Sequence, residues 1–195
     1  MSMNPQIFNQ ANVTNFIVDI PDSGITSAFS LNAQSAVIPG IRIPQVETVT
    51  GPQGLGRAYR AGTTFEFDPL TVRFLVDEDL DSWLQMYQWM ITTNNYLTGE
   101  NTAQKSGGAP DYVTVHILDN SKTKIVLSVN YYKPFISDLS EIEFSYTEEG
   151  DPQMICTATI PFVFMQVEKD GKIVTSRENI TQERERKISM HPSMR

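Results

Sequence analysis

Hydrophobic and polar positions alternate along most of the chain, which is typical of strands with one buried face. In the first such stretch, Phe16, Val18 and Ile20 share one parity and Asp19 takes the other. Comparable patterns predict about eight strands, over residues 15–20, 29–37, 41–49, 64–76, 113–117, 125–131, 142–146 and 154–167. This series predicts a mainly β fold, an antiparallel β-sandwich or barrel.

The expected strand over 64–76 changes face in its middle. Hydrophobic residues take odd numbers up to Phe67 and even numbers from Leu70 onward, with Pro69 between them. One extra residue swaps the faces of a strand, and proline cannot donate a hydrogen bond to the ladder. We therefore predict a β-bulge at this proline.

One segment has the helical period instead. Its apolar residues follow the spacing i, i+3, i+4, i+7 and i+11, and they are Leu80, Trp83, Leu84, Tyr87 and Ile91. Four acidic residues between 77 and 81 precede it, where carboxylates bind the free N–H groups of a first turn. We predict one α-helix over 80–94, packed on the sheet through this stripe.

Residues 51–62 hold four glycines in twelve positions. Because glycine weakens strand and helix interiors, we predict a long hairpin loop here, mobile in a free subunit and without regular structure. Arg57, Tyr59 and Arg60 lie near its expected tip.

Composition limits the class of protein. The 195 residues are 40% hydrophobic, which is enough for one domain with a real core. The single cysteine excludes an internal disulfide, no apolar stretch approaches the ~20 residues of a membrane helix, and the N-terminus does not resemble a secretory signal. The net charge of −8 argues against a protein that grips nucleic acid by its phosphates.

The charge is unevenly distributed. Residues 172–195 carry six basic and three acidic side chains, a net of +3, so residues 1–171 have a net of −11. We therefore divide the chain into an N-terminal arm (1–12), a β domain (13–170) and a basic extension (171–195). The extension is expected either to lie on an acidic neighbour or to be a disordered terminus.

Residues that could support catalysis are few. They are His116 on a polar strand face, Cys156 on an apolar one, and the carboxylate pairs Glu141/Glu143 and Glu148/Glu149. No sequence motif places a nucleophile beside a base, and no metal or phosphate-binding spacing occurs. The sequence predicts no enzyme and no cofactor, with Cys156 as a small core residue.

The order of these features resembles the tail tube proteins of contractile-tailed bacteriophages. The resemblance covers about residues 13–168. It rests on the strand 15–20, the strand and Pro-Gly corner 29–40, the loop 51–62, the strand 64–79 that leads into a tryptophan-bearing helix, and the closing segment 132–145.

This resemblance implies a hexameric ring whose subunits lend strands to one shared barrel, with rings stacked into a tube. Eight strands alone would form a filled barrel, so enclosing DNA requires shared strands. The implied partners are the sheath outside, baseplate and terminator proteins at the ends, and DNA with the tape measure in the lumen. The implied location is the virion tail, assembled in the host cytoplasm, without membrane insertion.

In the same resemblance the glycine-rich loop reaches the adjacent ring. The residues expected at this ring-stacking contact are Gln53, Leu55, Arg57, Tyr59 and Arg60. Arginine forms bidentate pairs with carboxylates, and tyrosine supplies contact area with a polar tip.

Three functions follow from the sequence. The first prediction is a structural subunit of the tail tube. The alternative is a related ring protein that initiates or terminates the tube at the baseplate or neck. The third is an unrelated β-sandwich module that binds sugars or protein ligands.

Overall fold

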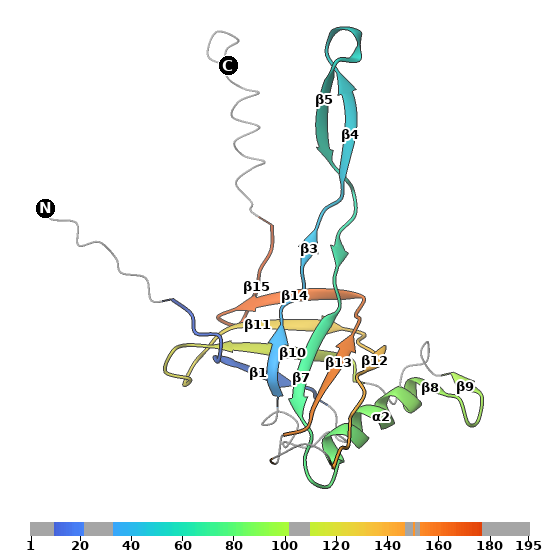
Figure 1. Cartoon of the computed structure of the whole chain (residues 1–195). Coiled ribbons are helices and arrows are strands. Elements are labelled where there is room, and N and C mark those ends of the chain that lie inside the picture. The colour runs from blue at the N-terminus through green and yellow to red at the C-terminus, as the bar shows by residue number, and fades with distance from the viewer. Residues whose placement is uncertain (1–9, 22–32, 102–109, 147–149, 151–152, 177–195) are drawn as a thin grey trace, which may run out of the picture.

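The computed structural model describes residues 10–21, 33–101, 110–146, 150 and 153–176. Within these ranges the chain forms two larger antiparallel sheets, one α-helix and a hairpin that extends from the body (Figure 1). The predicted mainly β fold with one helix is confirmed. None of the described helices is long and apolar enough to cross a membrane.

The first sheet has five strands in the order β1-β10-β11-β14-β15. They are β1 (Phe16–Asp19), β10 (Tyr112–Leu118), β11 (Ile125–Tyr132), β14 (Phe164–Lys169) and β15 (Lys172–Ile173). Four valines, Val18, Val115, Val129 and Val167, stand opposite one another across β1, β10, β11 and β14. This row forms part of the apolar face that the alternating pattern predicted.

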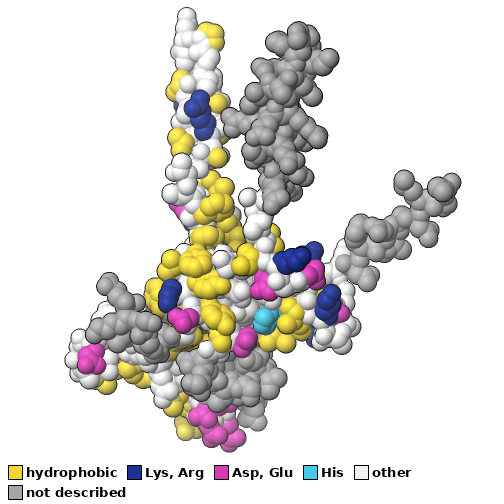
Figure 2. Space-filling view, turned by 180° about the vertical axis from the view of Figure 1, so that it is seen from behind, with side chains coloured by type: hydrophobic (Ala, Val, Ile, Leu, Met, Phe, Trp, Pro, Cys, Tyr) yellow, Lys and Arg dark blue, Asp and Glu magenta, His cyan; other side chains and the backbone are white. Residues whose placement is uncertain are grey.

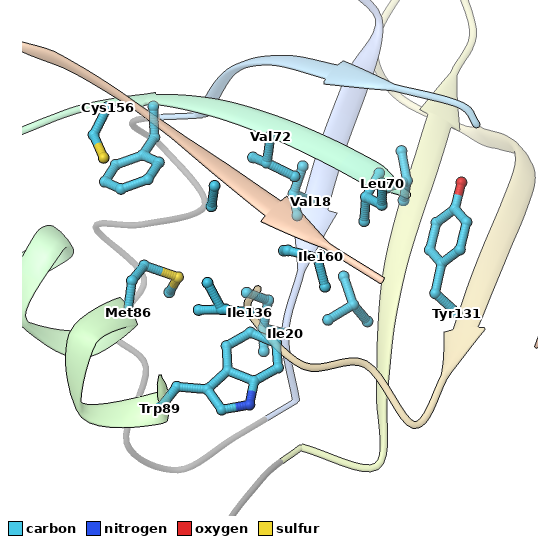
Figure 3. Close-up of a cluster of buried hydrophobic side chains, with 14 of the residues drawn as sticks. Val18, Ile20, Leu70, Val72, Met86, Trp89, Tyr131, Ile136, Cys156 and Ile160 are labelled. Atoms are coloured by element: carbon cyan, nitrogen blue, oxygen red, sulfur yellow. The ribbon is translucent and has the colours of Figure 1, made fainter. Parts of the chain in front are cut away.

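The second sheet has four strands in the order β12-β13-β7-β2. They are β12 (Asp138–Leu139), β13 (Ile155–Ile160), β7 (Leu70–Leu75) and β2 (Ala33–Val37). Alternate residues of β7 and β13 are buried and pair across the sheet, as Cys156 does with Phe74 and Ile160 with Leu70. The two sheets and the helix enclose one core (Figure 3).

Three expected strands are divided between sheets or ribbons. The segment 41–49 forms β3 (Ile41–Arg42) and β4 (Gln45–Thr50), and the segment 154–167 forms β13 and β14. The segment 64–76 forms β6 (Glu66–Phe67), which pairs with β3, and β7 in the four-stranded sheet. The bulge predicted at Pro69 is therefore wrong. The parity changes there because the chain leaves one ribbon and joins another sheet.

The expected strand over 142–146 is also wrong, since these residues form no strand. The edge of the sheet is occupied by β12 and by Ser140, which bonds to the backbone of Thr157. Past that point Phe144 and Tyr146 lie exposed, and none of the ladders among the described residues includes 142–146.

The two terminal segments join the body where they are described. Asn120 accepts from the backbone N–H of Asn12 at 3.3 Å and donates to the carbonyl of Gln10 at 2.9 Å. The strand β15 pairs with β14, so the first sheet continues into the segment set apart as a basic extension. The rest of the arm (1–9), residues 177–195 and residues 29–32 of the second expected strand lie outside the described residues.

The helix α2 (Asp81–Thr93) begins as the acidic residues predicted. Asp77 accepts hydrogen bonds from the backbone N–H groups of Asp81 at 3.1 Å and Ser82 at 2.9 Å. The hydrogen bonds from Ser82 hold the pKa of Asp77 below its usual value. After the helix, β8 (Asn94–Asn95) and β9 (Glu100–Asn101) form a short hairpin.

The buried face of α2 is not the predicted stripe. The core side is formed by Ser82, Met86 and Trp89, while Leu84 is 42% exposed. Trp83, which is only partly buried, still packs against the core. Seven of the thirteen helix residues are apolar and surround most of it, so periodicity alone could not select the face that the sheets cover.

Candidate assembly surface

A two-stranded ribbon projects from one end of the body (Figure 1). It consists of β4 and β5 (Gly56–Ala61), paired from Gln45↔Ala61 to Thr50↔Gly56, with a short 3-10 turn at Pro52–Gly54. The prediction of an irregular loop over 51–62 is therefore wrong for residues 56–61, which form a strand.

Glycines border the ribbon instead of interrupting it. Gly54 adopts a φ of +71° in the tip, a conformation that favours glycine. At the other end, a Cβ on Gly62 would lie 2.5 Å from the carbonyl oxygen of Pro44. The glycines therefore mark the turn at the tip and the place where the two backbone segments approach each other closely, at the junction of the ribbon and the body.

The residues predicted to contact an adjacent ring all lie on this ribbon. Gln53 and Leu55 are at the tip, Arg57 and Tyr59 share one face of β5, and Arg60 is on the opposite face. The guanidinium of Arg57 already pairs with Glu47 of the same ribbon at 2.7 Å. Of the two arginines, Arg60 forms no ion pair with a described residue.

The ribbon has no core of its own. Its large apolar side chains, Val46, Val49, Leu55 and Tyr59, are all exposed, with Leu55 at 84%. A lone two-stranded hairpin is marginally stable in water, and its outer edges carry open backbone groups. The ribbon therefore leaves these apolar side chains uncovered by the described residues.

An apolar patch surrounds the base of the ribbon, and we call it the base patch. Its exposed members are Ile38, Ile41, Ile43 and Phe65. Figure 2 shows hydrophobic side chains gathered between the ribbon and the body. Ring contacts continue inward from Phe65 through Phe67 and Phe162 to the buried Tyr131, at centroid distances of 6.2, 5.7 and 4.8 Å. The base patch is therefore continuous with the core.

The base patch was not among the surfaces predicted from the sequence. The available signal was Arg42 between two isoleucines in a short stretch bounded by Gly40 and Pro44. Arg42 pairs with Glu66 at 2.9 Å and with Asp68 at 3.4 Å, which joins β3 to β6. Both isoleucines are exposed, and the pair formed by β3 and β6 belongs to neither of the two larger sheets.

The residues considered for catalysis are dispersed. Nδ1 of His116 lies 2.8 Å from the hydroxyl of Ser128, in a polar hollow of the five-stranded sheet. Glu141 and Glu143 are exposed, and 148–149 lie outside the described residues. No group of three or more potential metal ligands occurs among the residues that the structure describes.

Cys156 is a core residue, as predicted, and we expect it to be unreactive in the native protein. It is fully buried, and burial raises the pKa of its thiol. Because the thiolate is the reactive species, maleimide should label the native chain at least about 100-fold more slowly than the chain in guanidinium. Mass spectrometry of timed samples measures this ratio. Equal rates in both conditions would contradict the burial of this thiol.

The chain matches the phage tail tube protein family over residues 2–167. It is 70% identical over 169 residues to the tail tube terminator protein of Enterobacteria phage T4, covering 87% of this chain and 95% of that protein. The tube-terminating cap of the anti-feeding prophage has a similar fold, with a TM-score of 0.62 at 14% identity over 87% of this chain and 99% of the other. The sheath/tube terminator of the PVC extracellular contractile injection system gives 0.57 at 14% identity, over 83% and 99%.

These relatives correct the first functional prediction, a subunit repeated along the tail tube. The T4 protein is a terminator, and the two similar folds are a terminating cap and a terminator. The alternative prediction, a ring protein at an end of the tube, agrees with them better. The alternating strands and the helix define a fold but do not indicate the position of the protein along a tail. Since the family match spans residues 2–167, the chain belongs to the phage tail tube protein family and is a structural part of the virion tail.

Proposed function

We propose that this protein terminates the tail tube of a contractile-tailed phage by forming a ring on its last layer. The observation that carries the proposal is the 70% identity to a tube terminator over nearly the full length of both chains. The role is structural, without catalysis, cofactor or membrane insertion. The partners are the tube and sheath at the tube end, with DNA and the tape measure passing through the lumen.

The exposed apolar surfaces support assembly into a ring, which we propose is a hexamer. The base patch and the ribbon present large apolar side chains that one subunit leaves uncovered. Exposed apolar patches of this kind mark protein interfaces. A head-to-tail contact that closes on itself would cover the base patch and pair the open strand edges.

Termination also requires that the two ends of the ring differ. A head-to-tail contact that does not close continues into a filament. In our proposal the ribbon contacts the last layer of the tube, and the opposite end of the body does not accept a further tube ring. The two ends of one subunit differ in structure, which supports this proposal, since the ribbon extends from one end and α2 lies at the other (Figure 1).

Gold labelling of a C-terminal tag in purified tails tests the proposal. We expect gold at one end of each tube, the end away from the baseplate, and image averages of that end should show a six-fold ring. A tube subunit tagged in the same way serves as the control and should label the whole length. Gold along the tube, or at the baseplate end, would overturn the terminator assignment.

A further inference from the structure

The side of α2 that faces away from the core carries a second apolar surface. Its exposed members are Leu84, at 42%, and Tyr96 and Leu97 of the following hairpin, at 68% and 74%. The ring of Tyr87 stacks on Trp83 at 5.3 Å, and its hydroxyl lies 2.9 Å from that of Tyr96. We call Leu84, Tyr87, Tyr96 and Leu97 the outer α2 surface.

The core does not need this surface. Met86 and Trp89 already fill the side of α2 that faces the sheets (Figure 3). A helix at the surface of a protein usually has one apolar stripe and a polar opposite side. An apolar stripe on the second side of α2 therefore indicates a second packing partner.

The charge of the segment that carries the outer α2 surface indicates the chemistry of that partner. Residues 76–101 contain five carboxylates and no lysine, arginine or histidine. Asp77 is engaged in capping the helix, but Glu78, Asp79 and Asp81 are exposed and form no ion pair with a described residue. A partner with lysine or arginine side chains could form ion pairs with these carboxylates.

The ribbon of a second copy does not fit as that partner. The arginines of the ribbon, Arg57 and Arg60, lie at the end of the molecule opposite α2 (Figure 1). Joining the ribbon end of one copy to the α2 end of the next would propagate a filament. A protein that ends a tube must avoid this contact, and this step rests on the proposed function.

We propose that the outer α2 surface docks a basic segment of a third tail protein, distinct from this chain and from the tube subunit. Aliphatic side chains of the segment cover Leu84 and Leu97. An arginine or lysine stacks on the ring of Tyr96, as cations do on aromatic faces, while others pair with Glu78 and Asp79. The ring would then join the tube at one end and a different protein at the other.

Photo-crosslinking in assembled tails tests this surface. A benzophenone amino acid replaces Leu97, and the same replacement of the exposed Val126 on β11 serves as the control position. After irradiation, mass spectrometry should identify a peptide of a third protein, with lysine or arginine next to aliphatic residues, at position 97 alone. Cross-links to another copy, to the tube subunit or to an acidic peptide would overturn the proposal, as would no cross-link at all.

Charge variants separate this inference from the terminator role. In Glu78→Gln/Asp79→Asn tails the cross-link yield should fall about tenfold, with Glu143→Gln as the matched control on another exposed carboxylate. Gold at the tube end should stay unchanged in both variants. Unchanged cross-linking in the double variant would refute the electrostatic part of the proposal. Loss of gold in the control tails would instead indicate failure of the terminator assignment.

Discussion

Removing the ribbon should leave a folded subunit that no longer binds the tube end. The register places Gln45 directly opposite Ala61. An Asn-Gly turn can therefore replace residues 46–60 and connect Gln45 directly to Ala61. None of the buried hydrophobic residues of the described core lies between 46 and 60. The body therefore keeps its packing while the exposed contact surface of the ribbon is lost.

Two measurements follow this change. The thermal midpoint of the purified subunit should move by no more than a few degrees, since roughly 1 kcal/mol shifts a domain of this size by about 2–4 °C. Gold labelling at tube ends should disappear. The variant Glu143→Gln is the control, because it changes one exposed carboxylate outside the ribbon and keeps the whole ribbon. Normal labelling by the truncated chain would exclude the ribbon as the tube contact. If the truncated chain did not fold, the ribbon would instead be needed for the stability of the core.

The sheets could be predicted because one face of each central strand is buried. Val18, Val115 and Val129 alternate with polar residues and align across three neighbouring strands, so the pattern along the chain matches burial across the sheet. Alternation does not indicate which sheet a strand joins. At Pro69 and Pro161 hydrophobic residues continue on both sides of the proline while the chain passes from one sheet or ribbon to another, so the proline marks a boundary inside a segment that the pattern predicts as one strand.

The residues of the candidate assembly surface could be predicted only in part. Counting glycines identified the ribbon as a special segment and placed Arg57 and Tyr59 on it, but counting cannot distinguish glycines inside a loop from those at the ends of a strand pair. The base patch could not be predicted, because a sequence does not distinguish an exposed isoleucine from a buried one. The choice between tube subunit and terminator depends on which proteins the chain contacts in the tail, and the hydrophobic pattern of one subunit does not contain that information.

The second large effect concerns the face of α2. We expect Trp89→Ala to destabilise the subunit by about 3–5 kcal/mol, the usual cost of removing a buried tryptophan side chain. Trp89 is 4% exposed and packs among the core residues, and its indole N–H has no partner among the described residues, so the loss is one of apolar packing. Urea unfolding of the purified subunit, followed by circular dichroism, measures the free energy of unfolding.

Leu84→Ala is the matched control on the same helix. Leu84 belongs to the stripe that the periodicity selected, yet it lies on the outer α2 surface, and truncating it should change the free energy of unfolding by less than about 1 kcal/mol. Trp83→Ala should fall between the two, since Trp83 packs on the core from one side and stacks on Tyr87 from the other. The order of the three variants therefore reports how the helix is rotated against the sheets. If Leu84→Ala were the most damaging, the predicted stripe would face the core, and the outer α2 surface would not be free to bind a third protein.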